Sequence, residues 1–397
     1  MSLLRRIATA ILTEGFRRDP LMRIGVLFLV LNLLIALGLV LTSHNGVDYK
    51  HRALGTDFIT FWTASWMVLH GDAGSIYDIP KVTRLVNQLL PGHEGVLFWL
   101  YPPTFLVPVV PLALLPYLPS LFVFTALGLG LCCLALRHWP DRKLHLLLFL
   151  AAPATLLNLL QGQNGFFTAG LWVAGLALLP KRPVLAGALL GLLVFKPQLA
   201  VLAPFVLLLS GNWRGLCGFA VSAGLFVLAS LLVSGPDMWQ QFFSLSGFSF
   251  SLVSEGLILP WSKMGSLFVS ARMLGLPPLP ALLLHGLGAV VALVAVAGIW
   301  RSPSAPQGLK SAAVLLAALI VTPHQFDYDL VLLLGALAFW HEGLKGEWKP
   351  EEKLVAALLW FGPLFTTPLA GATNLGLLPL LLLAALWNLS KKAEPIR

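Results

Sequence analysis

Long apolar runs separated by short polar segments repeat along almost the whole chain, from residue 22 to residue 389. A helix that crosses a bilayer needs about 20 apolar residues. Some of the runs reach that length and others fall short of it, so they predict spanning helices together with tilted, broken or partial passes. The runs occupy residues 21–42, 103–116, 118–136, 144–160, 165–180, 183–210, 214–234, 278–300, 310–323, 326–341, 354–371 and 374–389.

Two long stretches interrupt this pattern, at residues 43–102 and 235–277. Both mix Trp and Phe with polar residues, which is typical of helices that lie in the membrane interface. Residues 341–353 have the composition of a solvated loop. We therefore predict one all-α polytopic membrane domain over residues 1–397, with about 11–13 transmembrane or partial helices and interfacial helices in the two long loops.

Composition points the same way, because 58% of the residues are hydrophobic and only 11% are charged. A soluble domain carries about 25% charged residues, so the bilayer is the expected partner. The net charge of +9 arises from basic residues placed singly between apolar runs. This is the pattern of membrane topology signals, and no nucleic-acid partner is predicted. Cys132, Cys133 and Cys217 lie in apolar runs and predict neither a disulfide framework nor a metal site.

The N-terminal segment is basic and leads into an apolar run, Leu21 to Leu41, that is long enough to span. No small-residue cleavage site follows, so we predict an uncleaved first helix with a cytoplasmic N-terminus. Basic residues near the C-terminus place that end in the cytoplasm too. The two long loops and the turn at residues 323–329 then lie outside.

The middle of the chain allows two arrangements, which differ in where five basic residues lie. If every run spans, these residues face the outside, against the positive-inside rule. If residues 103–116 form a partial pass and residues 183–210 form a hairpin bent at Lys196–Pro197, they face the cytoplasm, and we favour this arrangement. The five residues are Arg137, Arg142, Lys143, Lys181 and Arg182.

Asp57 stands at the start of a predicted short helix in the first long loop. Asp is a good helix N-cap, which is one interpretation. The other is a carboxylate held at the membrane surface, able to take a proton from a hydroxyl group. The two roles are compatible.

Polar residues also interrupt the apolar runs of the middle region. Amides such as those of Gln163 and Asn164 cannot face lipid without cost, so they form either a plain turn or a polar binding site. Lys196 lies within an otherwise uncharged apolar stretch, where a lysine costs about 3 kcal/mol on insertion scales. One interpretation is that the lysine snorkels to the membrane surface from a bend in the chain. The other, which we favour, is an anionic partner, and a phosphate group would suit it.

The segment before the run at 326–341 carries His324, Asp327 and Asp329. The two aspartates are two positions apart and would point to different sides of a helix. They lack the ligand spacing of a known metal site, so no metal site is predicted, and these residues are expected to form a polar wall of an external cavity. Tyr101 precedes a Pro–Pro–Thr sequence that fixes how the chain re-enters the membrane, and it is a further candidate for lining a cleft.

Several catalytic motifs are missing from the sequence. It contains no Walker loop, no GxSxG elbow, no HExxH pair and no dinucleotide fingerprint. ATP-driven transport and the hydrolases that use these motifs are therefore unsupported.

An ordered set of short motifs over roughly residues 50–335 resembles glycosyltransferase family 87, the DUF2029 group. Each motif is weak alone, and their shared order makes the resemblance specific. The motifs are Thr56-Asp57-Phe58, Phe61-Trp62, Ala64, Gly71, Tyr77-Asp78, Tyr101-Pro102-Pro103-Thr104, Pro111 to Pro116, Gly162-Gln163-Asn164-Gly165, Lys181-Arg182-Pro183, Ala186-Gly187, Gly191, Lys196-Pro197-Gln198-Leu199, Trp213-Arg214, Trp261 to Ser266, Thr322-Pro323 and Phe326 to Leu330.

The resemblance implies a GT-C fold with the catalytic acidic residue in the first extracytoplasmic loop, in a bacterial inner membrane. Such enzymes transfer a sugar, commonly mannose, from a polyprenyl-phosphate carrier and usually invert the anomeric centre. Asp57 matches the position of the loop aspartate of the family. The family often has Tyr where this chain has His324, which leaves the role of His324 open, and the last two predicted spans match no motif.

Under this interpretation Asp57 is the general base for the incoming hydroxyl group. The leaving group is a phosphate ester, which needs positive charge more than an acid. Lys196 would supply that charge across one outward-opening pocket shared with Asp57, and the remaining candidates would bind the donor or acceptor. They are Tyr101, Gln163, Asn164, Gln198, Lys263, His324, Asp327 and Asp329.

No obligatory cofactor is predicted, although the scheme is compatible with a divalent ion. The acceptor is a glycan, a lipid or a protein. A transporter or flippase of lipid-linked sugars is the alternative, because transporters also use broken helices at mid-membrane. The two large external segments favour the enzyme. A non-catalytic scaffold subunit is a third possibility.

Overall fold

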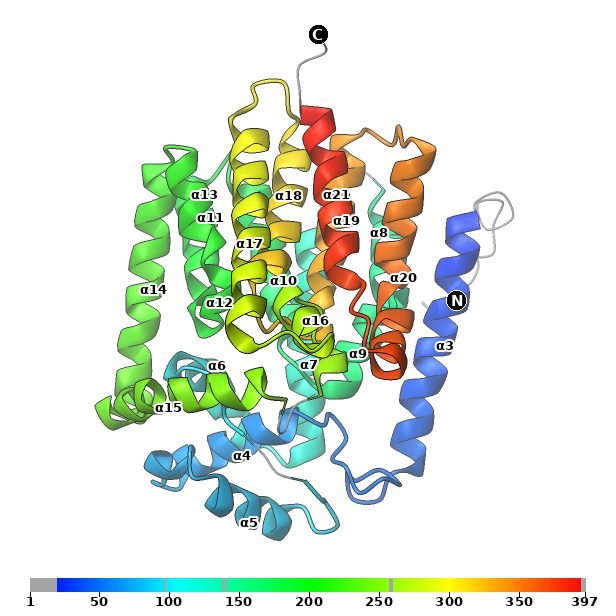
Figure 1. The fold of residues 1–397 in the computed structure, drawn as a ribbon. Coiled ribbons are helices and arrows are strands. Elements are labelled where there is room, and N and C mark those ends of the chain that lie inside the picture. The colour runs from blue at the N-terminus through cyan, green and yellow to red at the C-terminus, as the bar shows by residue number, and fades with distance from the viewer. Residues whose placement is uncertain (1–19, 96–97, 138, 140, 257–259, 394–397) are drawn as a thin grey trace, which may run out of the picture.

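The computed structural model describes residues 20–95, 98–137, 139, 141–256 and 260–393. In this part of the chain the secondary structure is helical, with isolated β-bridges and no strand (Figure 1). The predicted all-α polytopic membrane protein is confirmed. The basic segment that precedes the first span lies outside the described residues.

Five helices are long and apolar enough to cross a bilayer. Their outer surfaces expose large apolar side chains, such as Leu33 of the first helix (61% exposed) and Leu232 of the third (81% exposed). Exposed leucines at this density need lipid rather than water around them. The five helices are α3 (Pro20–Thr42), α7 (Tyr117–Leu136), α14 (Trp213–Ser234), α17 (Pro278–Arg301) and α20 (Pro350–Thr373).

A further span is broken in its middle. Helices α8 (Arg142–Ala151) and α9 (Pro153–Gln161) meet at an angle of 53°, because Pro153 lacks the N–H that would continue the helix ladder. The break leaves backbone carbonyls without helical donors. The side chain of Asn32, on α3, donates to the carbonyl oxygens of Leu150, Ala151 and Ala152 at 3.3, 3.0 and 3.4 Å.

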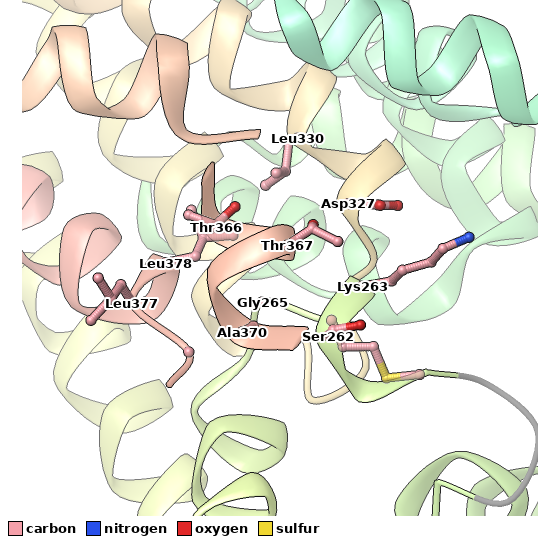
Figure 2. A pocket seen from close by; sticks show the side chains of 12 residues that line it. Ser262, Lys263, Gly265, Asp327, Leu330, Thr366, Thr367, Ala370, Leu377 and Leu378 are labelled. Carbon is pink, nitrogen blue, oxygen red and sulfur yellow. The ribbon is translucent and has the colours of Figure 1, made fainter. Parts of the chain in front are cut away.

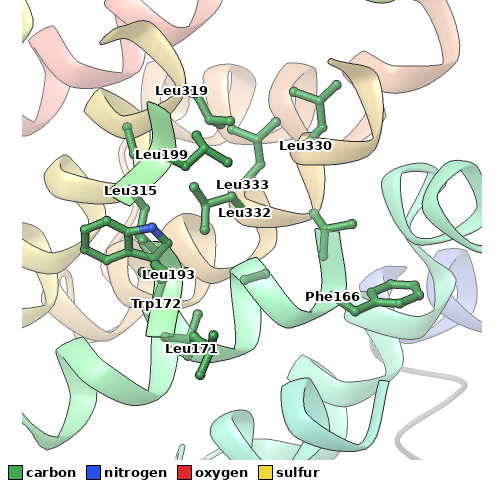
Figure 3. Packing of buried hydrophobic residues seen from close by; sticks show 14 of the residues in the cluster. Phe166, Leu171, Trp172, Leu193, Leu199, Leu315, Leu319, Leu330, Leu332 and Leu333 are labelled. Atoms are coloured by element: carbon green, nitrogen blue, oxygen red, sulfur yellow. The ribbon is translucent and has the colours of Figure 1, made fainter. Parts of the chain in front are cut away.

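Three shorter helices form the centre of the bundle: α10 (Gly165–Leu178), α18 (Gln307–Val321) and α19 (Val331–Gly343). Twelve of the fifteen residues of α18 are buried. Figure 3 shows Trp172 of α10 and Leu315 of α18 in one cluster of buried side chains. The outer helices shield α10, α18 and α19 from lipid. These three central helices have 13–15 residues, fewer than a span needs.

In the middle region the chain follows the path of the second predicted arrangement, and the side of the membrane that the five basic residues face stays a prediction. Helix α11 (Pro183–Gly191) continues as η4 (Leu192–Phe195), and the chain then reverses at Lys196 into α12 (Pro197–Ala200) and α13 (Leu202–Leu209). The two arms return to the same end of the bundle (Figure 1). Residues 103–114 form one short apolar helical segment, made of η2 (Pro103–Phe105), α6 (Leu106–Val109) and η3 (Val110–Leu114).

Contacts between distant segments gather the basic loops at one end of the bundle. The ring of Trp139 packs on Phe339, that of His145 packs on His341, and the Ser302 hydroxyl donates to Ala393 O. The helix ends and loops that carry Arg142, Arg301, Lys345 and Lys392 therefore lie together. The positive-inside rule favours a cytoplasmic position for this end, which stays a prediction.

The opposite end carries most of the two long loops. Helices α4 (Phe58–Leu69), α5 (Ile79–Leu89) and α15 (Pro236–Ser254) lie across the lower end of the bundle in Figure 1. We expected α4 to lie in the interface, but nine of its twelve residues are buried inside the protein. The remaining elements are η1 (Ala73–Ser75), η5 (Trp261–Lys263), α16 (Leu267–Met273), η6 (Asp327–Leu330) and α21 (Leu378–Ala393).

Candidate active site

A cavity of about 440 Å³ lies at this end of the bundle. Its walls come from the start of α4, residues 98–102, the turn of the Lys196 hairpin, α15 and residues 323–328. Aromatic rings make up much of the surface, and a few polar side chains interrupt them. The polar lining residues are Thr56, Asp57, Thr60, Gln163, Gln198, Ser246 and His324.

Asp57 occupies the N-cap position of α4, but its side chain makes no capping hydrogen bond. Its Oδ2 atom accepts a hydrogen bond of 2.9 Å from Gln163 Nε2, and its Oδ1 atom accepts one of 3.3 Å from Thr56. Burial raises the pKa of Asp57, and the Gln163 hydrogen bond and the charge of Lys263 oppose that rise. The place of Asp57 in the sequence suggested a helix N-cap. In the structure its side chain instead lines the cavity and accepts a hydrogen bond from Gln163.

The turn between α9 and α10, residues 161–164, holds charged residues from three other segments. Gln161 Nε2 donates to Asp327 Oδ1 at 3.0 Å, Gln163 donates to Asp57, and Asn164 Oδ1 accepts from Lys196 Nζ at 3.0 Å. The sequence left open whether these amides form a plain turn or a binding site. They form a turn whose amides bind the charged groups of the protein itself.

Gly162, inside this turn, has a left-handed backbone with φ of 62°. A Cβ atom at this position would lie 2.7 Å from Phe58 Cβ and 3.0 Å from Gly55 Cα. Only glycine meets both conditions without strain. The close approach brings the amide turn against the start of α4, where Asp57 lies.

Lys196 is 1% exposed and lies behind the cavity wall. Its Nζ atom is 2.5 Å from Asp329 Oδ1 and 4.6 Å from the centroid of the Tyr328 ring. The predicted anionic partner is thus a carboxylate of the chain. Phe195, Pro197 and Gln198 line the cavity, and Lys196 does not. We expected Asp57 and Lys196 to face each other across one pocket, but Gln163 and Asn164 lie between them.

Tyr101, Gln198 and His324 line the cavity, and their roles toward a substrate stay predictions. Tyr101 donates its hydroxyl hydrogen to Gln163 Oε1 at 2.9 Å. The His324 ring lies between Phe250 and Phe268, with centroid distances of 5.1 and 5.5 Å. Burial lowers the pKa of His324 to about 4, so its ring is neutral at pH 7.

Lys263 and Asp327 border a second, much smaller pocket of about 10 Å³, which is room for about one water molecule. Figure 2 shows both side chains at its edge, with Thr366 of α20 on the other side. Lys263 is close enough to Asp57 for its charge to lower the pKa of that carboxyl group. Among the described residues Lys263 forms no ion pair.

Sequence reasoning missed the contribution of α15, whose Phe242, Ser246 and Phe250 side chains form part of the cavity wall. The Trp and Phe content of the second long loop was the only signal for it. In the described part of the chain no three His, Cys, Asp or Glu side chains are grouped to hold a metal ion.

The helical bundle and its partly polar cavity define an integral membrane protein with a candidate binding site near its end. The model of glycosyltransferase family 87 matches residues 99–323. The match covers more than half of the chain, so the protein belongs to glycosyltransferase family 87 and is an integral membrane glycosyltransferase. The matched region includes Tyr101, Gln163, Lys196 and Lys263 but not Asp57. No curated protein and no solved structure gave a match.

Proposed function

We propose that this protein transfers a sugar from a polyprenyl-phosphate carrier to an acceptor at the extracytoplasmic face of a bacterial inner membrane, with inversion. The sugar is mannose or another hexose or pentose. The observation that carries the proposal is the position of Asp57 in the wall of the 440 Å³ cavity, held there by Gln163. The GT-C assignment and the polyprenyl carrier rest on the motif resemblance.

In this scheme Asp57 acts as the general base. Its carboxylate takes the proton from the acceptor hydroxyl group as the hydroxyl oxygen bonds to the anomeric carbon. The bond from that carbon to the phosphate oxygen breaks, and the phosphate leaves with the bonding electron pair. The raised pKa of Asp57 supports this role, because a carboxylate that is harder to ionise is a stronger base.

The departing phosphate gains negative charge and needs a cation near it. Asp329 already neutralises Lys196, and the buried ammonium group does not reach the cavity surface. We therefore assign the phosphate to Lys263, which borders the smaller pocket rather than the 440 Å³ cavity. Lys263 has no ion-pair partner among the described residues and is close enough to Asp57 for its charge to act on that carboxyl group. Asp327 accepts a hydrogen bond from Gln161 and interacts with the charge of Lys263. It would therefore fix the position of Lys263 relative to the amide turn.

The remaining cavity residues suit a neutral sugar. A neutral His324 ring offers one hydrogen-bond donor and one acceptor, and Gln198 has both in one amide. The aromatic walls, including Tyr101, can pack against the apolar face of a sugar ring. The scheme requires no cofactor. The acceptor is a glycan, a lipid or a protein.

The experiment is reconstitution of the full chain into liposomes with polyprenyl-phosphate sugars and candidate acceptors. Sugar transfer to the acceptor and flux of the donor across the bilayer are measured in the same vesicles. We expect transfer by the wild type and its loss in folded Asp57→Ala protein. Flux without transfer would instead identify a flippase, and transfer retained by Asp57→Ala would remove Asp57 as the base.

A further inference from the structure

We infer that Gln163 is a positioning residue that holds the Asp57 carboxylate in its ionised, base-competent form, and that the surrounding turn fixes its amide in the one orientation that does so. The inference rests on the proposed role of Asp57. The sequence predicted that Gln163 binds the substrate. The inference instead assigns Gln163 a function toward Asp57, the proposed base of the protein itself.

Two donors fix the orientation of the amide. Gln163 Oε1 accepts from the backbone N–H of Asn164 at 3.1 Å and from the Tyr101 hydroxyl at 2.9 Å. A backbone N–H can only donate, so the end of the amide that faces it must be the oxygen. The Nε2 end is then turned toward Asp57 Oδ2, 2.9 Å away. An amide flipped by 180° would lose the hydrogen bonds to the Asn164 N–H and to the Asp57 carboxylate, and only the Tyr101 hydroxyl, which can also accept, could still pair with it.

The backbone on both sides of Gln163 is also held. Asn158, 1% exposed, donates from Nδ2 to Gln163 O at 3.0 Å and accepts at Oδ1 from Gly165 N–H at 3.0 Å. The Asn164 side chain is fixed by Lys196. Gln163 itself is 6% exposed. The donor to Asp57 is therefore presented by a rigid turn and not by a side chain that has to find its partner.

Several titratable groups from neighbouring elements influence Asp57. Lys263 and Lys196 favour its ionised form. Asp327 and the hydroxyls of Tyr101, Tyr117 and Tyr328 also interact with its charge. Burial raises the pKa of Asp57, and of the groups that lower it, the Gln163 hydrogen bond has the largest effect. Removing that donor should therefore make Asp57 harder to ionise.

The test is the pH profile of kcat/KM for Gln163→Leu, whose acid limb reports ionisation of the base in the free enzyme. A hydrogen bond to a charged group supports a shift of about one to two pH units toward higher pH. On the acid limb this is a loss of roughly ten- to a hundredfold, recovered as the pH is raised. Tyr101→Phe leaves the Asn164 N–H in place, so a smaller shift is expected. Asn388→Leu, which removes an amide from α21 that donates to Ala384 O, is the matched control with no shift.

Gln163→Glu is the second variant, in case Gln163→Leu folds poorly. It keeps an oxygen for the Asn164 N–H and replaces the donor with a second carboxyl group, so the acid limb should again move to higher pH. Folding of each variant is followed by its melting temperature. A uniform loss of activity at all pH values with an unmoved acid limb in these variants would overturn the inference and leave the proposed function standing. Full activity in Asp57→Asn would instead remove Asp57 as the base, the role on which the inference rests.

Discussion

Lys196 Nζ and Asp329 Oδ1 are 2.5 Å apart, although 133 positions separate the two residues in the chain. Both side chains are almost fully buried, at 1% and 2% exposure. The pair joins the turn of the α11–α13 hairpin to the connection between α18 and α19. Removing one partner would leave an uncompensated charge inside the protein.

We therefore expect Asp329→Leu alone, and Lys196→Met alone, each to lower the free energy of unfolding by about 3–5 kcal/mol. Replacing both partners, as in Lys196→Met with Asp329→Leu, should restore most of that loss, because two apolar side chains need no compensation. A double-mutant cycle measured by detergent-induced unfolding tests this coupling. Additive losses in the double variant would show that the two residues do not act as a pair.

Asp57→Asn should reduce sugar transfer by about 10²–10⁴-fold, the usual contribution of a general base. The same change should raise the melting temperature at neutral pH. The pKa of Asp57 is raised in the folded state above its ordinary value of 3.8, so keeping the group ionised costs folding free energy above that raised pKa. The stabilisation should fade as the pH falls below 3.8, where the carboxyl group is protonated in both states. A thermal melt of both proteins across pH measures it, and equal melting temperatures at neutral pH would contradict it.

Lys263→Met should lower kcat/KM for the lipid-linked donor by roughly a hundredfold, because a developing phosphate charge loses its cation. Lys81→Met is the control, since Lys81 pairs with Asp72 at 45% and 37% side-chain exposure and exposed pairs contribute little. Steady-state kinetics at varied donor concentration separates the two variants. Equal kinetics would transfer the phosphate role to another group.

Asn32→Leu removes the donor that satisfies the carbonyl oxygens at the α8–α9 break. A buried acceptor left without a partner costs about 1–3 kcal/mol, so we expect a loss of stability in this range. Leu33→Ala, on the exposed face of the same helix, should change stability much less. Unfolding of both variants in mixed micelles compares them, and the opposite order of losses would contradict the role of Asn32.

The hairpin arrangement predicts the sidedness of labelling in a variant without native cysteines. Single cysteines introduced as Arg142→Cys and Arg182→Cys should react only with reagent added from the cytoplasmic side. Lys81→Cys, in the first long loop, should react only from outside. Labelling of positions 142 and 182 from the outside would show that the bundle is inserted the other way.

Much of the architecture follows from apolar run length and from the positions of the basic residues. The hairpin at Lys196–Pro197 was predictable because proline and lysine together disfavour a straight span, and because the five basic loop residues then fall on one side. The partial pass at residues 103–116 was predictable from its short length and from the side on which the five basic residues then fall.

The sequence predicted which residues belong to the candidate site but only some of the contacts between them. The burial of Lys196 predicted an anionic partner, but the neighbouring sequence did not identify that partner as Asp329. The pairing depends on how α18 and α19 pack against the hairpin. The burial of α4 was missed for a similar reason, since its composition suits both a lipid interface and a protein core. Partner choice among amides and carboxylates depends on ångström-scale distances that sequence spacing does not encode.

The separation of Lys196 from Asp329 has a consequence for biogenesis. At a synthesis rate of about 5–20 residues per second, the ribosome makes Asp329 roughly 7–27 s after Lys196. During that interval the Asp329 carboxylate does not yet exist, so it cannot pair with Lys196. The unpaired lysine opposes stable insertion of the hairpin by about 3 kcal/mol. Nascent chains that stop before the α18–α19 connection lack Asp327 as well, so the amide turn stays incomplete. Assembly of the proposed catalytic centre is therefore a late event, which requires synthesis of the chain up to residue 329 of 397.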